Sequence, residues 1–293
     1  MIREIEYYAP THKKELFEII HNDNRDICLI AGGTDLIINI NKKHLSPDAI
    51  VNLKSMEELN YIEEEDGIIK IGATATHNQI ANSLLIKEKA LALAQACKSV
   101  GSTQIRNLGT IGGNIVNASP AADSVAALLA LDASVLLESY GDKRKVKISD
   151  LHTHTGGIDL NKGEVLTEIS FKSYSKNIFS YFVKFGLREA LAIVELSVTA
   201  VMEIDENNFC KDAKISIGAI ERHPVSAKCV EEEFVGKELN LETIEDCIEK
   251  MSEFTAKTLF KTPFKDLIPY KKQCIKGVSR EVFEAIYYKA VRK

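Results

Sequence analysis

Short apolar runs and amphipathic segments follow one another along this chain, a pattern that predicts a fold mixing strands and helices. Apolar runs bounded by turn-forming residues predict strands at residues 27–31, 49–53, 61–62, 68–71, 134–138, 145–148, 179–185, 192–204 and 213–219. Apolar positions at helical spacing predict helices at residues 12–20, 36–40, 77–82, 86–100, 120–131, 243–260 and 279–291. Residues 101–113 are rich in glycine, and we expect them to form a loop.

The order of these elements divides the chain into three segments. Residues 1–55 read as helix, strand, turn and helix, and residues 56–174 place helices between pairs of strands. Residues 175–293 give three strands and then helices, an arrangement typical of an α+β unit. The chain shows no internal repeat and no low-complexity segment. We therefore predict an α+β fold.

The composition is that of a globular protein and argues against nucleic-acid binding and membrane contact. The 293 residues are 45% hydrophobic and 27% charged, which is typical of a globular protein, and the net charge of −5 gives no reason to expect nucleic acid as a partner. Charges interrupt the first ten residues where a signal peptide has its apolar core, and the apolar stretch 125–137 is too short to span a bilayer. We therefore predict a cytoplasmic protein without membrane contact.

Cysteine spacing bears on metal binding. The six cysteines stand at positions 28, 97, 210, 229, 247 and 274, and none of them forms a C-x-x-C pair. A zinc or iron–sulfur centre requires clustered thiolates, so we expect free thiols and no metal centre on this chain.

Two loops with paired glycines stand out as candidate binding elements. The first is Leu-Ile-Ala-Gly-Gly-Thr-Asp-Leu at residues 29–36, and the second is Thr-Ile-Gly-Gly-Asn at residues 110–114. Glycine permits positive φ and leaves room for a ligand, so consecutive N–H groups can converge on phosphate oxygens. Thr34, Thr110 and Asn114 could add side-chain donors. Two such loops could hold a diphosphate from both sides, although either loop alone is better explained as a tight turn.

The chemistry around these loops leaves other roles open. The chain has neither the Rossmann G-x-G-x-x-G nor the Walker G-x-x-x-x-G-K-[ST] pattern, so any nucleotide is held by a different fold. Asp123 falls in the first turn of a predicted helix, where it either stabilises the helix dipole or accepts a hydrogen bond from a ligand hydroxyl. Arg106 could contact the charge of a diphosphate, or it could be a packing or surface residue. We expect valine at Gly112 or Gly113 to abolish ligand retention without unfolding the chain.

The residues in and around both loops also carry a family resemblance. Leu-Ile-Ala-Gly-Gly-Thr-Asp-Leu at residues 29–36 and Gln-Ile-Arg-Asn-Leu-Gly-Thr-Ile-Gly-Gly-Asn-Ile-Val-Asn-Ala-Ser-Pro-Ala-Ala-Asp at residues 104–123 closely resemble the flavin-binding subunit of molybdenum hydroxylases such as xanthine, carbon monoxide and nicotinate dehydrogenases. The resemblance extends over essentially the whole chain. It implies an FAD-binding domain of the vanillyl-alcohol-oxidase type, with subdomains at residues 1–55 and 56–174. A C-terminal flavoprotein domain with an antiparallel sheet and helices follows at residues 175–293.

The resemblance also implies a set of cofactor-binding residues and no catalytic side chain. The two loops would hold the FAD diphosphate, Asp123 would bind a hydroxyl group of the cofactor, and Lys184 and Leu166 would lie near it. Val100 stands where some relatives place an aromatic ring near the flavin, and Ile193 would lie against one flavin face. The full implied set is Leu29, Ile30, Ala31, Gly32, Gly33, Thr34, Asp35, Leu36, Val100, Thr110, Ile111, Gly112, Gly113, Asn114, Asp123, Leu166, Lys184 and Ile193.

The function implied by the resemblance is electron relay in an oxidoreductase of the xanthine dehydrogenase type. A large partner subunit carrying molybdopterin would hydroxylate an N-heterocycle, xanthine-like or nicotinate-like. A small partner subunit with [2Fe-2S] clusters would pass the electrons to FAD on this chain, and NAD or NADP would accept them. Two alternatives remain open: a free-standing FAD oxidoreductase, and a non-catalytic assembly subunit that has lost FAD.

Overall fold

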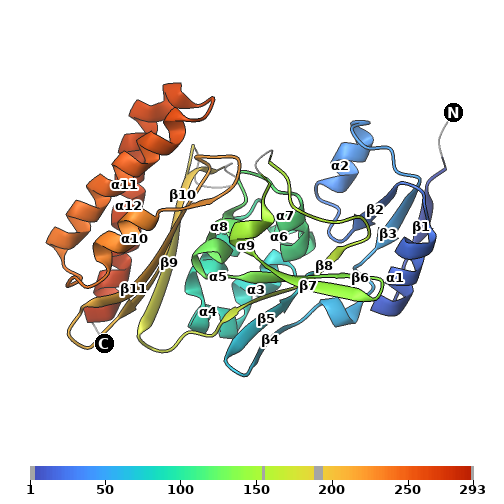
Figure 1. The fold of residues 1–293 in the computed structure, drawn as a ribbon, viewed down its shortest axis with the longest axis horizontal. Helices are drawn as coiled ribbons and strands as arrows, with labels where there is room; N and C mark the ends of the chain where they lie inside the picture. The colour runs from blue at the N-terminus through green and yellow to red at the C-terminus, as the bar shows by residue number, and fades with distance from the viewer. Residues whose placement is uncertain (1–3, 154–155, 188–193, 292–293) are drawn as a thin grey trace.

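The computed structural model describes residues 4–153, 156–187 and 194–291, and three β-sheets follow one another along this part of the chain (Figure 1). The N-terminal, middle and C-terminal sheets lie in a row, each with its own helices. The α+β architecture predicted from the sequence is present in all three. The boundaries proposed at residues 55/56 and 174/175 stay a prediction.

The N-terminal sheet has three parallel strands in the order β1 (Glu6–Tyr8), β3 (Ala49–Asn52), β2 (Ile27–Ile30). Helix α1 (Lys13–Asn22) buries Leu16 in a small apolar cluster with residues of β3 and the turn that follows it. The chain leaves β2 through the first glycine loop and enters α2 (Leu36–Asn41), a short helix without a buried residue. This connection places the loop at the carboxyl end of β2.

The middle sheet has five antiparallel strands in the order β4-β5-β8-β6-β7. Its strands are β4 (Ile62–Glu65), β5 (Ile68–Gly72), β6 (Ser134–Ser139), β7 (Asp142–Lys147) and β8 (Val165–Lys172). Its helices are η1 (Glu57–Leu59), α3 (His77–Asn82), α4 (Leu84–Lys89), α5 (Leu91–Ser99), α6 (Thr103–Leu108), α7 (Ile111–Val116), α8 (Asp123–Ala130) and α9 (Ile148–Leu151). Strand β8 is central because it pairs with both β5 and β6.

The C-terminal sheet is antiparallel, in the order β12-β11-β10-β9, and has helices on both faces. Its elements are β9 (Ile178–Gly186), β10 (Val194–Ile204), β11 (Cys210–Gly218), β12 (Val225–Ser226), α10 (Lys228–Phe234), α11 (Leu241–Phe260), η2 (Lys265–Leu267) and α12 (Ile268–Val291). Helices α10 and α12 contact one face, whereas α5 and α8 of the middle unit contact strands β9 to β11. Burial on both faces explains why nearly every residue of β10 is buried.

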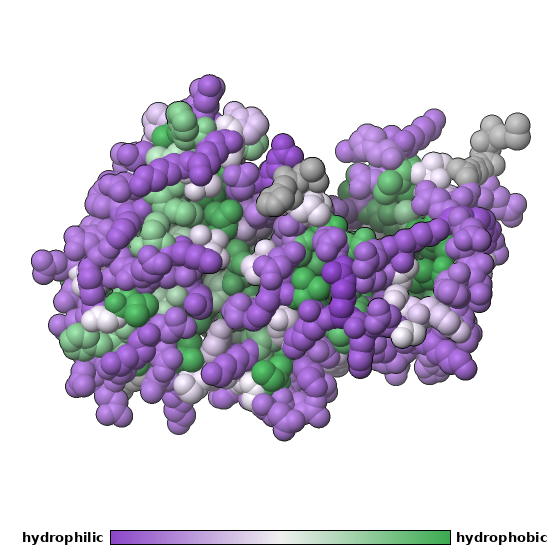
Figure 2. Space-filling view, viewed as in Figure 1, coloured by the Kyte–Doolittle hydropathy of each residue, from purple (hydrophilic) through white to green (hydrophobic). Residues whose placement is uncertain are grey.

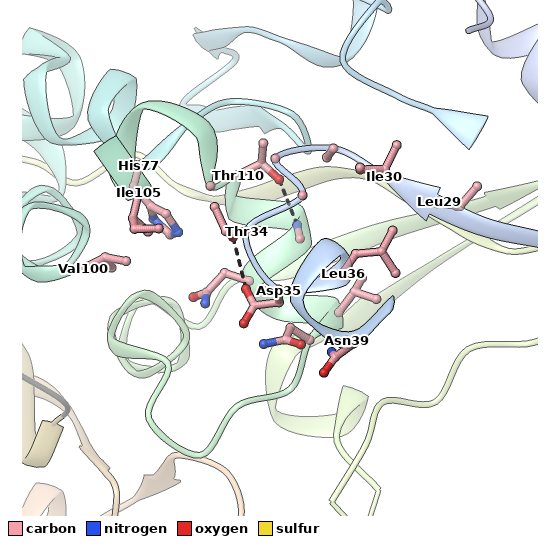
Figure 3. A pocket seen from close by; sticks show the side chains of 18 of the residues that line it. Leu29, Ile30, Thr34, Asp35, Leu36, Asn39, His77, Val100, Ile105 and Thr110 are labelled. Carbon is pink, nitrogen blue, oxygen red and sulfur yellow. Dashed lines mark hydrogen bonds between the residues drawn. The ribbon is translucent and has the colours of Figure 1, made fainter. Parts of the chain in front are cut away.

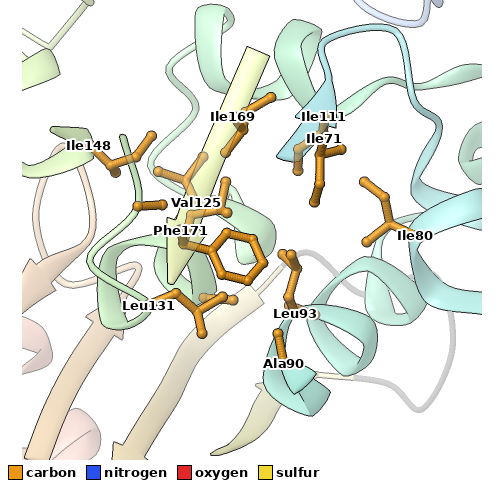
Figure 4. Close-up of a cluster of buried hydrophobic side chains, with 14 of the residues drawn as sticks. Ile71, Ile80, Ala90, Leu93, Ile111, Val125, Leu131, Ile148, Ile169 and Phe171 are labelled. Carbon is orange, nitrogen blue, oxygen red and sulfur yellow. The ribbon is translucent and has the colours of Figure 1, made fainter. Parts of the chain in front are cut away.

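The largest apolar cluster joins the middle and C-terminal units. Isoleucines of β5 and β8, Leu93 of α5 and Val125 of α8 meet around Phe171, as Figure 4 shows. Phe182 of β9 and Val201 of β10 belong to the same cluster. This shared core fixes the C-terminal sheet against α5 and α8, which come before and after the second glycine loop in the sequence. Hydrophilic side chains cover most of the face in Figure 2, and apolar ones show mainly in the recesses between elements.

Several predicted elements differ from the observed ones. The single helix expected at residues 86–100 is wrong, because Ala90 leaves helical geometry at φ −149° and separates α4 from α5. The loop expected at residues 101–113 contains α6 and the start of α7, whose N-termini are capped by Ser102 and Thr110. Helix α8 begins at Asp123 instead of Pro120. The sequence reading also missed β1, β8 and α10.

Candidate functional site

A pocket of about 290 Å³ lies where the two glycine loops meet (Figure 3). All eight residues of the first loop line it, and the second loop contributes Thr110, Gly113 and Asn114. Val100, also predicted to bind the cofactor, lies in its wall. The remaining lining residues were not predicted from sequence: Asn39, Leu45, His77, Ile105, Gly109, Val116 and Asn117.

Gly32 allows the first loop to lie directly against the end of α6. A Cβ added at Gly32 would stand 2.2 Å from the Leu108 carbonyl oxygen and 2.9 Å from the Cα of Gly109. No side chain fits in that space. Gly33 then takes φ +69°, a conformation that costs glycine little and turns the chain towards α2. Gly32 therefore brings the first loop against the residues just before the second loop, and Gly33 sets the direction of the turn.

The backbone N–H groups of the first loop are open to a ligand. Residues 31–35 follow β2 and precede α2, and their N–H groups donate to no acceptor in the part of the chain that the structure describes. Unpaired N–H groups at a pocket wall are suited to an anionic oxygen, because successive backbone donors form a concave anion site. The first loop thus leaves its N–H groups unpaired at a pocket, and its role as a phosphate-binding turn stays a prediction.

The second loop uses its N–H groups inside the protein. Ile111 donates to the Ala75 carbonyl and Gly112 to the Ala73 carbonyl, each at 2.9 Å, so this loop is tied to the residues after β5. Gly113 donates to Thr110 Oγ1 at 3.2 Å, and the Asn114 N–H donates to the Thr110 carbonyl at 3.0 Å. The predicted row of free amides is therefore formed by the first loop and not by the second.

Gly112 has a packing role that the sequence did not reveal. Both Ile111 and Gly112 are buried and lie outside the pocket lining. A Cβ at Gly112 would stand 2.7 Å from Ala73 Cβ and 2.8 Å from its carbonyl oxygen. This contact argues against the expectation that valine at Gly112 leaves the fold intact, because the added atoms would overlap the residue that follows β5. Gly113, by contrast, is exposed and faces the pocket.

Asn114 offers a side-chain donor in place of the missing amides. The Ser124 hydroxyl donates to Asn114 Oδ1 at 2.6 Å, which fixes the orientation of the side-chain amide. With its oxygen occupied, Asn114 presents its NH₂ group as the available donor. Thr110 contributes a hydroxyl at the same wall.

A buried ion pair lies next to the pocket and joins two units of the fold. Lys184 of β9 contacts Asp123 Oδ2 of α8 at 2.7 Å, and the Ser99 hydroxyl donates to the same oxygen at 3.0 Å. Burial raises the pKa of the Asp123 carboxyl, and the Lys184 ammonium group and the Ser99 hydroxyl only partly offset it. Asp123 Oδ1 is buried without a hydrogen-bond partner. Asp123 therefore has one carboxylate oxygen that could accept a further hydrogen bond. This carboxylate is bound to Ser99, which directly precedes Val100 of the pocket wall.

His77 is a further buried polar group at the pocket, and sequence reasoning missed it. It is the first residue of α3 and is only 2% exposed, and its Nδ1 has no hydrogen-bond partner. Burial, together with the nearby Arg106 charge, lowers the pKa of His77 to about 4, so the ring is neutral at pH 7. Arg106 itself donates to the carbonyls of Val100 and Gly101, each at 3.0 Å, and holds the turn between α5 and α6.

Two other predicted residues lie elsewhere or are not described. Leu166 is buried in the core of β8, opposite Leu137, and does not reach the pocket. Ile193 lies outside the described residues. The remaining predicted residues, including Lys184 and Asp123, are at the pocket or next to it. The open amides of the first loop, the Asn114 donor and the unpaired Asp123 oxygen fit a dinucleotide with its diphosphate and hydroxyl groups.

Other site classes find little support in the described residues. Within residues 4–153, 156–187 and 194–291, no three His, Cys, Asp or Glu side chains are grouped so that they could hold a metal ion. All six cysteines are free thiols. In the same part of the chain no helix has the length and apolar character needed to cross a membrane.

Comparison with protein families matches almost the entire chain. Residues 3–171 match the FAD-binding domain in molybdopterin dehydrogenase, and residues 181–284 match the CO dehydrogenase flavoprotein C-terminal domain. The chain is 35% identical to the nicotinate dehydrogenase FAD-subunit of Eubacterium barkeri, over 96% of both chains. It is 30% identical to the xanthine dehydrogenase FAD-binding subunit of Escherichia coli O157:H7, over 80% of each.

Solved structures confirm the predicted fold class. The carbon monoxide dehydrogenase from Hydrogenophaga pseudoflava contains a chain that superposes with a TM-score of 0.87 at 23% identity, over 99% of both chains. Quinoline 2-oxidoreductase from Pseudomonas putida 86 gives a TM-score of 0.86 at 23% identity, over 98% of both. At this identity the likeness establishes the fold alone. The family matches identify its two parts as an FAD-binding domain and a C-terminal domain.

Proposed function

Because this chain belongs to the family of FAD-binding subunits of molybdopterin dehydrogenases, we propose that it is the electron-transfer subunit of a multi-subunit molybdenum hydroxylase. In this role it binds FAD in the pocket between its glycine loops. It receives electrons from [2Fe-2S] clusters of a small partner subunit and delivers them to NAD or NADP. A large partner subunit with molybdopterin oxidises the substrate, an N-heterocycle of the xanthine or nicotinate kind, in the cytoplasm.

The observation that carries this proposal is the row of open N–H groups at residues 31–35. These groups belong to residues that line a pocket, and they have no acceptor among the described residues. They include Gly32, which contacts the end of α6 so closely that only glycine fits. A dinucleotide diphosphate supplies the anionic oxygens that such a row binds. The assembly-subunit alternative predicts no ligand here and leaves these unpaired groups without an explanation.

The residues of this chain then have distinct tasks around the cofactor. The first loop binds the diphosphate from one side, and Thr110 and Asn114 donate from the other. Asp123 accepts a hydrogen bond from a hydroxyl group through Oδ1, while Lys184 and Ser99 hold its second oxygen in place. Val100 and Ile105 add apolar wall that excludes water. FAD, when bound, supplies the capacity to accept and release electrons.

The partners in this proposal follow from the named relatives. Those relatives are subunits or medium chains of nicotinate, xanthine and carbon monoxide dehydrogenases. The free-standing oxidoreductase alternative requires a substrate site on this chain itself. The pocket walls carry one buried neutral histidine and no paired acid and base among the described residues, which favours a relay over substrate chemistry.

The experiment that tests the proposal is purification of the affinity-tagged chain from its own cells. We expect two partner chains to co-purify, one containing molybdenum and the other containing iron and sulfide. The complex should reduce NAD⁺ or NADP⁺ when given nicotinate or xanthine, and activity should fall when FAD is stripped and return when it is added. A yellow monomer that oxidises a substrate without partners would contradict the proposal and support the free-standing oxidoreductase.

A further inference from the structure

We propose that His77 is a positioning residue for the cofactor and donates a hydrogen bond from Nε2–H to a phosphate oxygen of the bound dinucleotide. This inference rests on the proposed function, because it names a further contact within the same pocket. His77 belongs to neither glycine loop, and its role is visible only from the geometry around Gly109.

The space beside Gly109 is kept free by the absence of a side chain. A Cβ added there would lie 3.1 Å from the Ile105 carbonyl oxygen, 3.4 Å from His77 Cδ2 and 3.8 Å from Thr34 Oγ1. The imidazole edge of His77 and the hydroxyl of Thr34 therefore border the same small volume. That volume lies between the first loop and the residues that precede the second. This volume is open to the pocket, since Gly109, His77 and Thr34 all line the pocket.

The two ring nitrogens of His77 have different surroundings. Cδ2 is bonded to Nε2, so the edge near Gly109 carries Nε2, and Nδ1 is directed into the protein, where it has no partner. A neutral imidazole has a single N–H. A buried N–H without an acceptor is rarer than an under-satisfied acceptor, which assigns the proton to Nε2 at the pocket. Figure 3 shows His77 beside Ile105 and near Val100.

The His77 backbone is held as firmly as its ring. Its N–H donates to the Gly109 carbonyl at 3.0 Å, and the Thr76 side chain caps α3 by a reciprocal pair of bonds with Gln79. Thr76 also forms an isolated β-bridge with Thr110, the first residue of the second loop. The donor is thereby fixed relative to both loops before any ligand arrives, as a positioning role requires.

The surroundings favour a phosphate oxygen as the acceptor. The open N–H groups of residues 31–35 lie across the pocket, and the Arg106 guanidinium is close enough to lower the His77 pKa. Among the described residues that line the pocket, the acidic one is Asp35, which is exposed and whose carboxylate accepts a hydrogen bond from the Thr34 hydroxyl at 3.1 Å. A neutral donor among open amides, next to a cation, suits an anionic oxygen better than it suits a hydroxyl.

The test compares three replacements of His77 in the full-length chain with FAD as the probe. His77→Leu removes the donor, His77→Gln places an amide near the Nε2 position, and His77→Asn places it near the Nδ1 position. We expect His77→Leu and His77→Asn to raise the Kd for FAD about tenfold to hundredfold, since hydrogen bonds to charged groups have this strength. His77→Gln should recover most of the affinity. In the ³¹P NMR spectrum of bound FAD, one phosphate resonance should move in His77→Leu and return in His77→Gln.

Gly109→Ala tests the same contact while leaving His77 in place. The added methyl group fills the space between His77 and Thr34, so it should also weaken FAD binding and move the same resonance. Unchanged Kd and unchanged ³¹P resonances in His77→Leu would overturn the inference, as would equal rescue by Asn and Gln. If His77→Leu fails to fold, Gly109→Ala decides between the outcomes. Failure of the wild-type chain to bind FAD would instead overturn the proposed function, and this inference with it.

Discussion

The two glycine loops look alike in sequence but differ in what they offer a ligand. In the first loop residues 31–35 line the pocket, and their backbone N–H groups have no acceptor among the described residues. In the second loop Ile111 and Gly112 donate to carbonyls after β5, and Gly113 donates to the Thr110 side chain. The first loop is thus a set of backbone donors. The second is a rigid support that presents side chains.

The glycines of the two loops differ in the same way. Gly32 permits close contact with Leu108, and Gly33 permits a positive φ. Gly112 permits close contact with Ala73, which is internal packing, whereas Gly113 keeps the pocket open. A Gly-Gly pair therefore does not identify a ligand-binding turn by itself. The distinction depends on which atom occupies the place of the absent Cβ.

The largest effect is expected for Gly32→Val. The new side chain would overlap the Leu108 carbonyl and separate the first loop from α6, so both the seat of the loop and the pocket would be lost. We expect undetectable FAD binding by equilibrium titration and a loss of about 1–3 kcal/mol in the free energy of unfolding. Wild-type FAD affinity in this variant would show that contact between the loops is not needed.

We expect the free energy of unfolding to depend on pH through His77, which lines the pocket and is bound to Gly109, just before the second loop. Its pKa is about 4 in the folded chain against the ordinary histidine value of 6.5, so below pH 6.5 the unfolded chain binds a proton that the folded chain does not. The stability that this neutral histidine contributes is present above pH 6.5. It falls as the pH drops towards 4, by roughly 3 kcal/mol. Urea unfolding of FAD-free protein at several pH values measures this loss of stability. In His77→Gln the free energy of unfolding should change less between pH 6.5 and pH 4.

Alanine at Gly112 and at Gly113 separates support from binding. Gly112→Ala should lower the free energy of unfolding by about 1–3 kcal/mol, because its methyl group would overlap Ala73. Gly113→Ala meets only Thr110 Oγ1, at 2.9 Å, so its stability should change by less than about 1 kcal/mol while FAD binding weakens. Thermal unfolding and FAD titration of the matched pair give both quantities. Equal losses of stability would remove the distinction drawn between the two glycines.

The smallest effect is expected far from both loops, at Gly277. It lies exposed within α12, and a Cβ there meets nothing within 4 Å. Gly277→Ala should raise the free energy of unfolding by about 0.5–1 kcal/mol, because alanine loses less backbone freedom in a helix. FAD affinity should not change. A change in affinity would mean that stability and binding are coupled across the molecule, and the loop variants would need reinterpretation.

Periodicity predicted the elements whose pattern is local, and missed those that depend on tertiary contacts. The strand at residues 27–31 and the helix at residues 243–260 were placed within two residues of β2 and α11. Strand β8 was missed, although it is the centre of its sheet, because its burial depends on pairing with β5 and β6. Helix α7 was missed because Ile-Gly-Gly-Asn-Ile-Val has poor helix propensity and is held by the Thr110 cap and backbone contacts.

The site was predictable where residues adjoin in sequence and not where they converge in space. The first loop and the Thr110, Gly113 and Asn114 positions were predicted from their motifs and do line the pocket. His77 and Gly109 have no motif of their own. One signal was available: Thr76 and Gln79 form a capping box that fixes the start of α3. The link from that helix to the second loop is a β-bridge between distant residues, which sequence alone does not reveal.

Whether the pocket between the loops holds FAD can be measured from the visible spectrum of the purified full-length chain. The spectrum should be combined with mass spectrometry of what denaturation releases. We expect the absorption bands of a bound flavin and the release of FAD, or the uptake of added FAD by a chain isolated without it. A colourless and well-folded chain that takes up no added FAD would contradict it, and the glycine loops would then be turns only.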